Sequence, residues 1–332
     1  MKNKAYIIAE AEINHNGNIN TAIDMIKSAK KCGADCIKFQ YIIADELADP
    51  SSKFYQLFKE CEFSKKDFKK LKSISEDEYN IDFMITVPSV NSFWLSRELN
   101  IKKIKIGSSN LTNLILLQEI AKEKDKIEIY LSTGMGDLIE IEQALKNLNY
   151  NYGDNKYYMF HCTANYPTEY NNLNLNAIIT MKKIYDKIPI GYSDHTTDNI
   201  AAIIARSLGA TIFEKHFTLD NKMNGPDHFF STNPENFKNY IDSIRTVEIA
   251  LGEEQIKPAD SEIEMKRKTK RFLVANRDIK KGVKFKNDMF FTKRVGDVES
   301  PIAVNEFNII LNLKSPKDYK RGDILQWEDF NK

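Results

Sequence analysis

Cysteine is scarce in this sequence, with four residues among 332: Cys32, Cys36, Cys61 and Cys162. They lack the paired spacing of a zinc site, and Cys32 and Cys36 stand four positions apart across a predicted helix-to-strand junction. We therefore interpret all four as buried thiols. Because nothing indicates a disulfide framework, the cytoplasm is the expected compartment.

An excess of charge of either sign is also missing. Lys and Arg number 48, Asp and Glu number 47, and the formal net charge is +1. Without a broad basic surface, no binding of nucleic acid or anionic lipid is expected. No run of about 18 apolar residues is present that could cross a membrane. The apolar stretch near the N-terminus is also too short for a signal peptide.

What the sequence does contain is a repeated alternation of short apolar segments with amphipathic segments. The short segments are typical of strands buried on both faces. We place them at Ala5–Ala11, Cys36–Ile42, Asp82–Val87, Lys102–Ser108, Ile127–Thr133, Tyr157–Thr163, Ile188–Asp194 and Thr211–Thr218. Eight βα units in about 250 residues predict an α/β fold, a (β/α)8 TIM barrel. A doubly wound sheet is the alternative, but no GxGxxG turn follows the first segment.

The pattern changes after Gly252. We assign residues 1–252 to the barrel and the polar, charged residues 253–270 to a linker. Residues 271–332 carry short strand-like runs separated by turn-like segments, which predicts a small β-rich domain. With few apolar residues of its own, this domain is expected to dock on a barrel.

Chemistry in a barrel belongs at the C-terminal ends of its strands. Side chains two positions apart on a strand face the same side. Glu10 and Glu12 share a face in this way, and so do Lys38 and Gln40. A lone buried charge is costly, so these groups are expected to pair with one another or to bind ligands at one mouth.

Lysines at two of these strand ends suggest an anion site. Lys38 and Lys105, with Ser108 and Ser193, could hold a phosphate and a carboxylate, since an ammonium group is a point-charge donor suited to phosphate. The alternative is that both lysines extend to the rim of the barrel and are solvated there.

Histidines at the last two strands suggest a metal site. His195 and His216 follow or end adjacent strands, and imidazole suits Mn, Fe, Co or Zn. A pair of hydrogen-bonded core histidines explains the same spacing equally well.

Several short sequence motifs occur in an order along the chain that is typical of one family. They are AEINHNG (Ala11–Gly17), IKFQ (Ile37–Gln40), KIGS (Lys105–Ser108), LSTGM (Leu131–Met135), HCTANYPT (His161–Thr168), GYSDHT (Gly191–Thr196), EKHFTLD (Glu214–Asp220) and GPDH (Gly225–His228). The chain resembles the bacterial N-acetylneuraminate (sialic acid) synthase family, which includes legionaminic and pseudaminic acid synthases. The C-terminal VANRDIKKGVKF and TKRVGD resemble its antifreeze-like (SAF) domain.

The resemblance implies a transferase of carbohydrate biosynthesis. It would condense phosphoenolpyruvate with an N-acetylated amino sugar and release phosphate. The expected sugar is N-acetylmannosamine or a 2,4-diacetamido-2,4,6-trideoxyhexose. It also implies a domain-swapped homodimer and a divalent metal, Mn²⁺, with Mg²⁺ or Co²⁺ as alternatives. Two other readings stay open: a phosphoenolpyruvate-dependent synthase for another aldose, and an inert sugar-binding paralogue.

Carried over residue by residue, the resemblance assigns roles to twelve positions. The catalytic groups would be Glu10, Lys38 and Lys105, and the metal ligands would be His195 and His216. The substrate-binding groups would be Thr86, Ser108, Asn110, Tyr166, Ser193, Asp227 and Arg294, the last reaching across the dimer to the N-acyl group of the sugar.

Two departures concern carboxylates. Asn110 stands where the family's fourth-strand motif has Glu, and an amide cannot titrate. Glu12 stands in a slot that is usually Gly, and our hypothesis is that its carboxylate compensates for the missing one. In addition, residues 43–63, which cover the substrate in the family, read as a short loop.

Overall fold

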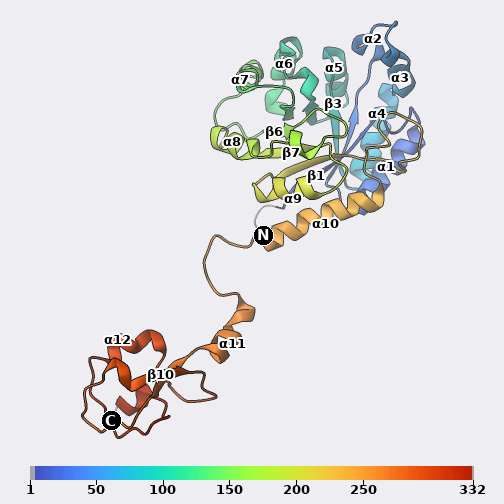
Figure 1. Ribbon diagram of the computed structural model, residues 1–332. Helices are drawn as coiled ribbons and strands as arrows, with labels where there is room; N and C mark the ends of the chain where they lie inside the picture. Colours follow the sequence, from blue (N-terminus) through green and yellow to red (C-terminus); the bar gives the residue numbers. More distant parts are fainter. Residues whose placement is uncertain (1–3, 331–332) are drawn as a thin grey trace. The chain divides into compact units, whose positions relative to one another are not determined.

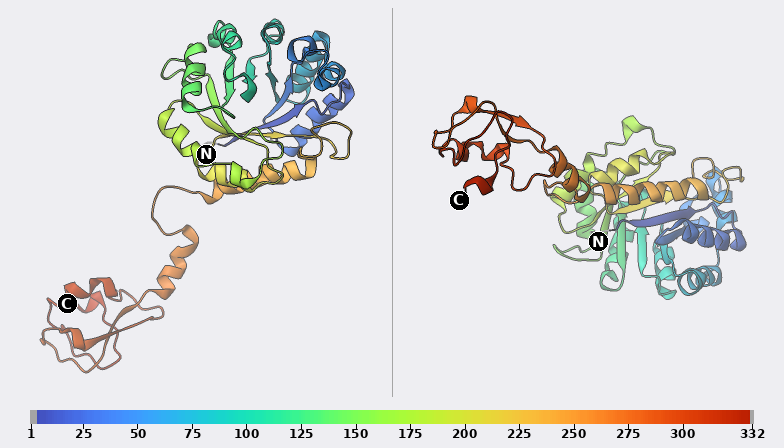
Figure 2. Two further views of the ribbon diagram at one scale, coloured as in Figure 1. Left: turned by 45° about the horizontal axis from the view of Figure 1, so that its top comes forward. Right: turned by 90° about the horizontal axis from the view of Figure 1, so that it is seen from below.

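The computed structural model describes residues 4–330 and divides the chain into two compact units, Met1–Gly252 and Glu253–Lys332. The boundary falls at the residue where the sequence pattern changes. Among the described residues, no helix combines the length and the apolar character that crossing a bilayer requires. Figures 1 and 2 show both units.

The first unit is a closed barrel of parallel strands in sequential order, which confirms the predicted fold (Figure 1). Its strands are β1 (Tyr6–Glu12), β2 (Cys36–Gln40), β3 (Asp82–Thr86), β4 (Lys103–Ile106), β5 (Glu128–Ser132), β6 (Tyr157–Cys162), β7 (Ile190–Asp194) and β8 (Ile212–His216). β1 pairs with both β2 and β8, which closes the sheet and leaves no free edge.

Helices cover the outside of the barrel (Figure 2). They are α1 (Ile19–Cys32), α4 (Lys65–Ser73), α5 (Val90–Glu98), α6 (Leu114–Ala121), α7 (Leu138–Asn147), α8 (Ala177–Ile184), α9 (Ile200–Ser207) and α10 (Pro234–Ala250). α10 lies against α1 and α9, so the last helix of the barrel closes onto the first.

Local sequence explains where α1 begins and ends. The Asn18 side chain accepts hydrogen bonds from two backbone N–H groups of the first turn, and Gly33 ends the helix at φ 99°, a conformation that suits glycine. Between these caps, Ala22, Met25 and Ile26 fall on one face at helical spacing and are buried against the sheet.

Residues 43–63 are not the short loop that the sequence suggested. They form two helices, α2 (Ala44–Leu47) and α3 (Lys53–Cys61). The Ser52 hydroxyl caps α3 by accepting a hydrogen bond from the Phe54 N–H, and Cys61 is buried at its end. Helices this short are marginal alone and form because they dock on the barrel, so the sequence pattern gave little sign of them.

The barrel interior changes from apolar to polar along its axis. One layer of side chains is apolar and consists of Ile8, Cys36, Met84, Tyr130, Phe160 and Ile212. Two residues further along each strand, on the same face, stands a polar group or a thiol: Glu10 follows Ile8, and Glu214 follows Ile212. The apolar layer is therefore the floor of the site.

The second unit contains a two-stranded antiparallel sheet, β9 (Phe272–Ala275) with β10 (Phe290–Lys293), and has its own apolar core around Leu273, Ile302 and Leu325. α11 (Asp260–Thr269) occupies most of the stretch predicted as a linker, and α12 (Phe307–Ile310) is a single turn.

Candidate active site

A cavity of about 360 Å³ opens at the C-terminal ends of the barrel strands, and every strand contributes to its lining. Its volume falls in the range of small-molecule sites. The lining includes ten of the twelve residues that the sequence predicted: Glu10, Lys38, Thr86, Lys105, Ser108, Asn110, Tyr166, Ser193, His195 and His216. Polar strand ends predicted from the sequence thus do meet at one mouth.

Two buried lysines are held by one glutamate at the base of the cavity. Glu214 on β8 places one carboxylate oxygen 3.1 Å from Lys38 Nζ and the other 3.3 Å from Lys105 Nζ. The three residues come from β8, β2 and β4, and all are at most 5% exposed. The ammonium groups are therefore inside the barrel and paired, which excludes the solvated-rim alternative.

Hydroxyl groups and a second carboxylate complete this network. Lys38 forms an ion pair with Glu10 and donates to Thr86 Oγ1 at 3.1 Å. Lys105 donates to Ser132 Oγ at 2.7 Å, and Ser193 donates to Glu214 at 2.9 Å. Each ammonium is thus oriented by several partners.

Burial and charge act in opposite directions on the pKa values of this network. Burial lowers the pKa of Lys38 to about 7, against the attraction of Glu214. Burial alone would raise the pKa of Glu214, but the charges of Lys105 and Lys38 hold it below its ordinary value. An anionic ligand would add the counter-charge that keeps Lys38 protonated.

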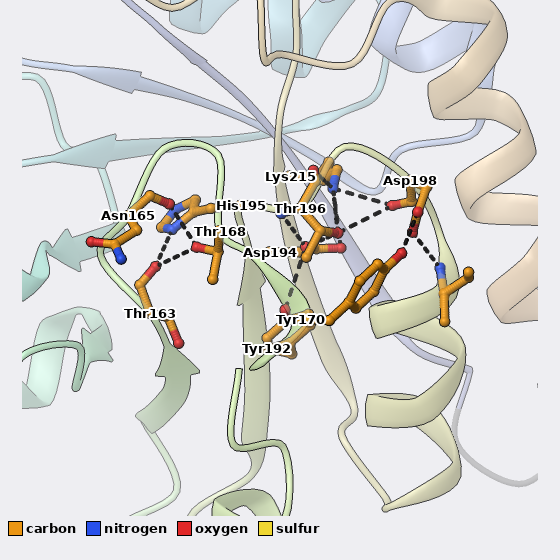
Figure 3. Close-up of polar contacts among 11 residues, drawn as sticks. Thr163, Asn165, Thr168, Tyr170, Tyr192, Asp194, His195, Thr196, Asp198 and Lys215 are labelled. Atoms are coloured by element: carbon orange, nitrogen blue, oxygen red, sulfur yellow. Dashed lines mark hydrogen bonds and ion pairs between the residues drawn. The ribbon is translucent and has the colours of Figure 1, made fainter. Parts of the chain in front are cut away.

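His195 is oriented by its backbone neighbours (Figure 3). Its Nδ1 lies 2.7 Å from the carbonyl oxygen of Thr163, which accepts a hydrogen bond from Nδ1–H and leaves Nε2 as the nitrogen with a free lone pair. The Tyr166 ring lies against the imidazole, with ring centroids 4.1 Å apart.

His216 is adjacent, with its ring centroid 5.3 Å from that of His195. Its Nδ1 is buried and makes no hydrogen bond. Burial, together with the charges of His195 and Lys38, holds the pKa of His216 well below its ordinary value. A neutral imidazole with an unused nitrogen is what metal coordination requires.

Two carboxylates lie beside this imidazole. Glu12 Oε2 is 3.4 Å from His216 Nδ1, and one ligand atom from each of Glu12, His216 and Asp227 lies within 4.8 Å of the others. Burial and the Asp227 charge raise the pKa of Glu12 to about 8, and burial raises that of Asp227. The residues present thus fit a divalent cation.

Ser108, Asn110 and Tyr166 also line the cavity. Asn110 accepts a hydrogen bond from the Asn113 side chain at 2.9 Å, so its amide is held in place. Gly134 allows Ser108 to sit where it does, because a Cβ at this glycine would lie 2.6 Å from Ser108 Oγ.

Other polar strand residues point away from the cavity. Asp194 and Lys215 form a buried ion pair of 3.2 Å, and Lys215 also donates to the Thr196 carbonyl (Figure 3). Since β-strand side chains alternate, Lys215 faces out while its neighbours Glu214 and His216 face in.

One predicted substrate residue belongs to the other unit. Arg294 follows β10 and has an exposed side chain. Sequence reasoning named Glu12 and gave no role to three other cavity residues: Glu214, Ser132 and Cys162. The signal for Glu214 was its position two residues before His216, on the same face of the strand.

Comparisons with known proteins agree with this arrangement. The sequence profile of the NeuB family matches residues 25–256, and that of the SAF domain matches residues 270–331. The chain is 36% identical to the N,N'-diacetyllegionaminic acid synthase of Campylobacter jejuni over 338 residues, which cover 97% of this chain and 99% of that protein.

Two further relatives show the same likeness. The N,N'-diacetyllegionaminic acid synthase of Legionella pneumophila is 34% identical over 340 residues, covering 97% of this chain and 94% of that protein. A crystal structure of N-acetylneuraminic acid synthetase from Leptospira borgpetersenii superimposes with a TM-score of 0.73 at 32% identity, covering 80% of this chain and 93% of that chain.

Proposed function

This chain belongs to the NeuB family, and on that premise we propose that it condenses phosphoenolpyruvate with an N-acetylated amino sugar and releases inorganic phosphate. The observation that carries the proposal is the pair of buried ammonium groups of Lys38 and Lys105, which converge from different strands on one cavity. A dianionic phosphate and a carboxylate on one small molecule match such a pair.

The ammonium groups first bind and orient phosphoenolpyruvate. Ser108 and Ser193 line the same cavity, and each hydroxyl would turn from its present acceptor, Cys162 Sγ or Glu214, to donate to an oxygen of this substrate. Fixing the enol carbon next to its target supplies an entropic advantage that a reaction between free molecules lacks.

The sugar in its open-chain form offers an aldehyde to that enol carbon. A divalent cation held at His195 and His216 would supply polarisation of the aldehyde oxygen. Mn²⁺ is our first choice, with Mg²⁺ or Co²⁺ as alternatives. Tyr166, which packs on His195, borders the space in which the sugar would lie.

A new carbon–carbon bond then leaves the pyruvyl carbon electron-deficient, and a water molecule adds to it. We assign the proton of that water to Glu10, and this assignment is supported by its burial in the barrel and its ion pair with Lys38. Collapse of the resulting tetrahedral centre breaks the bond to the phosphate oxygen and leaves a 2-keto-3-deoxy acid.

The sugar is expected to be either a 2,4-diacetamido-2,4,6-trideoxyhexose or N-acetylmannosamine. The first is favoured by the relatives named as N,N'-diacetyllegionaminic acid synthases. We further propose a domain-swapped homodimer in which Arg294 of one subunit contacts the N-acyl group in the other subunit's site.

The test is phosphate release by the full-length protein with phosphoenolpyruvate, Mn²⁺ and a panel of amino sugars, with product mass as the second readout. Release should require all three components and should stop on chelation of the metal. Release with a non-acylated aldose alone would favour a synthase for another sugar. Sugar binding without any release would show an inert paralogue and overturn the proposal.

A further inference from the structure

The metal ligands expected from the family are two histidines, His195 and His216. In this chain, however, the potential metal ligands that lie closest together are one histidine and two carboxylates. Ligand atoms of Glu12, His216 and Asp227 lie within 4.8 Å of one another. Glu12 lies on β1, while Asp227 lies in the segment between β8 and α10, 215 positions further along the chain. The barrel closure of β1 on β8 brings them together.

An orphaned nitrogen independently points to a ligand at this place. His216 is 8% exposed, and its Nδ1 has no hydrogen-bond partner. An unused buried imidazole nitrogen costs free energy unless something binds it. The neighbouring oxygen, Glu12 Oε2 at 3.4 Å, belongs to a carboxylate, and a cation would satisfy both atoms at once.

The backbone at Glu12 supports the same reading. Its φ of 37° is unusual for a residue with a side chain, and the β1–β2 ladder shifts register between Glu10 and Glu12. The corresponding family position is usually Gly, which adopts this conformation without strain. Strained backbone of this kind persists where it positions a functional group, and here it sets a carboxylate at the cavity.

We infer that Glu12 and Asp227 are direct carboxylate ligands, together with His216, of the divalent cation in this chain. His195 lies beside this group. The oxygen donors favour a harder ion such as Mn²⁺ over one that prefers nitrogen and sulfur. Glu12 thereby supplies a carboxylate to a site whose fourth-strand position carries Asn110 in place of Glu. This inference deepens the proposed function and rests on it for the identity of the cation.

The experiment is a Mn²⁺ titration of the metal-stripped, full-length protein without either substrate. Free Mn²⁺ is followed by its electron paramagnetic resonance signal. Removal of a residue that merely orients a ligand lowers metal affinity by roughly 10–100-fold. We expect Glu12→Gln and Asp227→Asn each to raise the Kd for Mn²⁺ by at least the upper end of that range, roughly 100-fold. Glu169→Gln, a change of an exposed glutamate, is the matched control and should leave the Kd unchanged.

The variant Glu12→Gly tests whether a loss of Mn²⁺ affinity is caused by misfolding, because glycine adopts the backbone conformation at this position without strain. This variant should keep or gain thermal stability while losing Mn²⁺ affinity. A wild-type Kd in Glu12→Gln and Glu12→Gly would overturn the inference, whatever happens to turnover. The same would follow if only the KM for sugar rose, since both carboxylates would then be sugar contacts. If the wild type binds Mn²⁺ but releases no phosphate with any sugar, the proposed function fails and the ligand assignment stands.

Discussion

Replacing Glu214 by glutamine should destabilise the barrel strongly. The change keeps the size of the side chain and an oxygen that can accept the hydrogen bond from Ser193, but removes the negative charge shared by Lys38 and Lys105. All three side chains are at most 5% exposed, so the lost charge is replaced only by the weak solvation that the cavity provides. Lys105 would be left with the Ser132 hydroxyl, and Lys38 with Glu10 and Thr86.

The expected loss of stability is the cost of breaking a buried ion pair, about 3–5 kcal/mol. At roughly 2–4 °C per kcal/mol for a domain of this size, Tm should fall by about 6–20 °C.

The depressed pKa of Glu214 determines how its contribution to stability changes with pH. Its contribution is present above the unfolded pKa near 4.5 and is lost as pH falls through the lower folded value. The difference in Tm between the variant and the wild type should therefore be largest at pH 7 and should decrease at acidic pH.

Binding of inorganic phosphate distinguishes the loss of a charge from a purely steric defect. Two ammonium groups without Glu214 should bind inorganic phosphate more readily, and an anion at 100 times its Kd adds about 2.7 kcal/mol of stability. The assay is thermal unfolding by circular dichroism with and without phosphate, with Glu169→Gln as the control. A Tm within about 1 °C of wild type, or equal phosphate stabilisation of both proteins, would refute the assigned charge network.

Three other results are expected. Because burial sets the pKa of Lys38 near 7, its positive charge is lost as pH rises, so kcat/KM for phosphoenolpyruvate should decline above pH 7 by up to about tenfold per pH unit; a flat profile to pH 9 would contradict this. Gly134→Ala should push Ser108 aside and raise the KM for phosphoenolpyruvate by roughly tenfold, with little change in Tm, as steady-state kinetics and a thermal scan would show. Arg294→Ala should weaken sugar affinity more than phosphoenolpyruvate affinity in paired KM measurements, and the reverse order would assign Arg294 the wrong role.

Much of the fold could be predicted from the local pattern of apolar and polar residues. Most strands are short apolar runs whose last residues are polar, and the period-two alternation of side chains fixes which of them face inward. The predicted boundaries lie within two residues of the observed ones. The segment at residues 43–63 was misread because helices of four and nine residues owe their stability to docking, which leaves little trace in the sequence.

The sequence by itself therefore determined the barrel, the change of pattern after Gly252, and a mouth that carries lysines, histidines and glutamates. It could not show that Glu214 bridges Lys38 and Lys105, because that depends on the closure of the sheet and on the stagger of its strands. Nor could it show that Glu12 and Asp227 meet at His216. Local sequence specifies which way a side chain points, whereas only the packed tertiary structure decides which distant charge it meets.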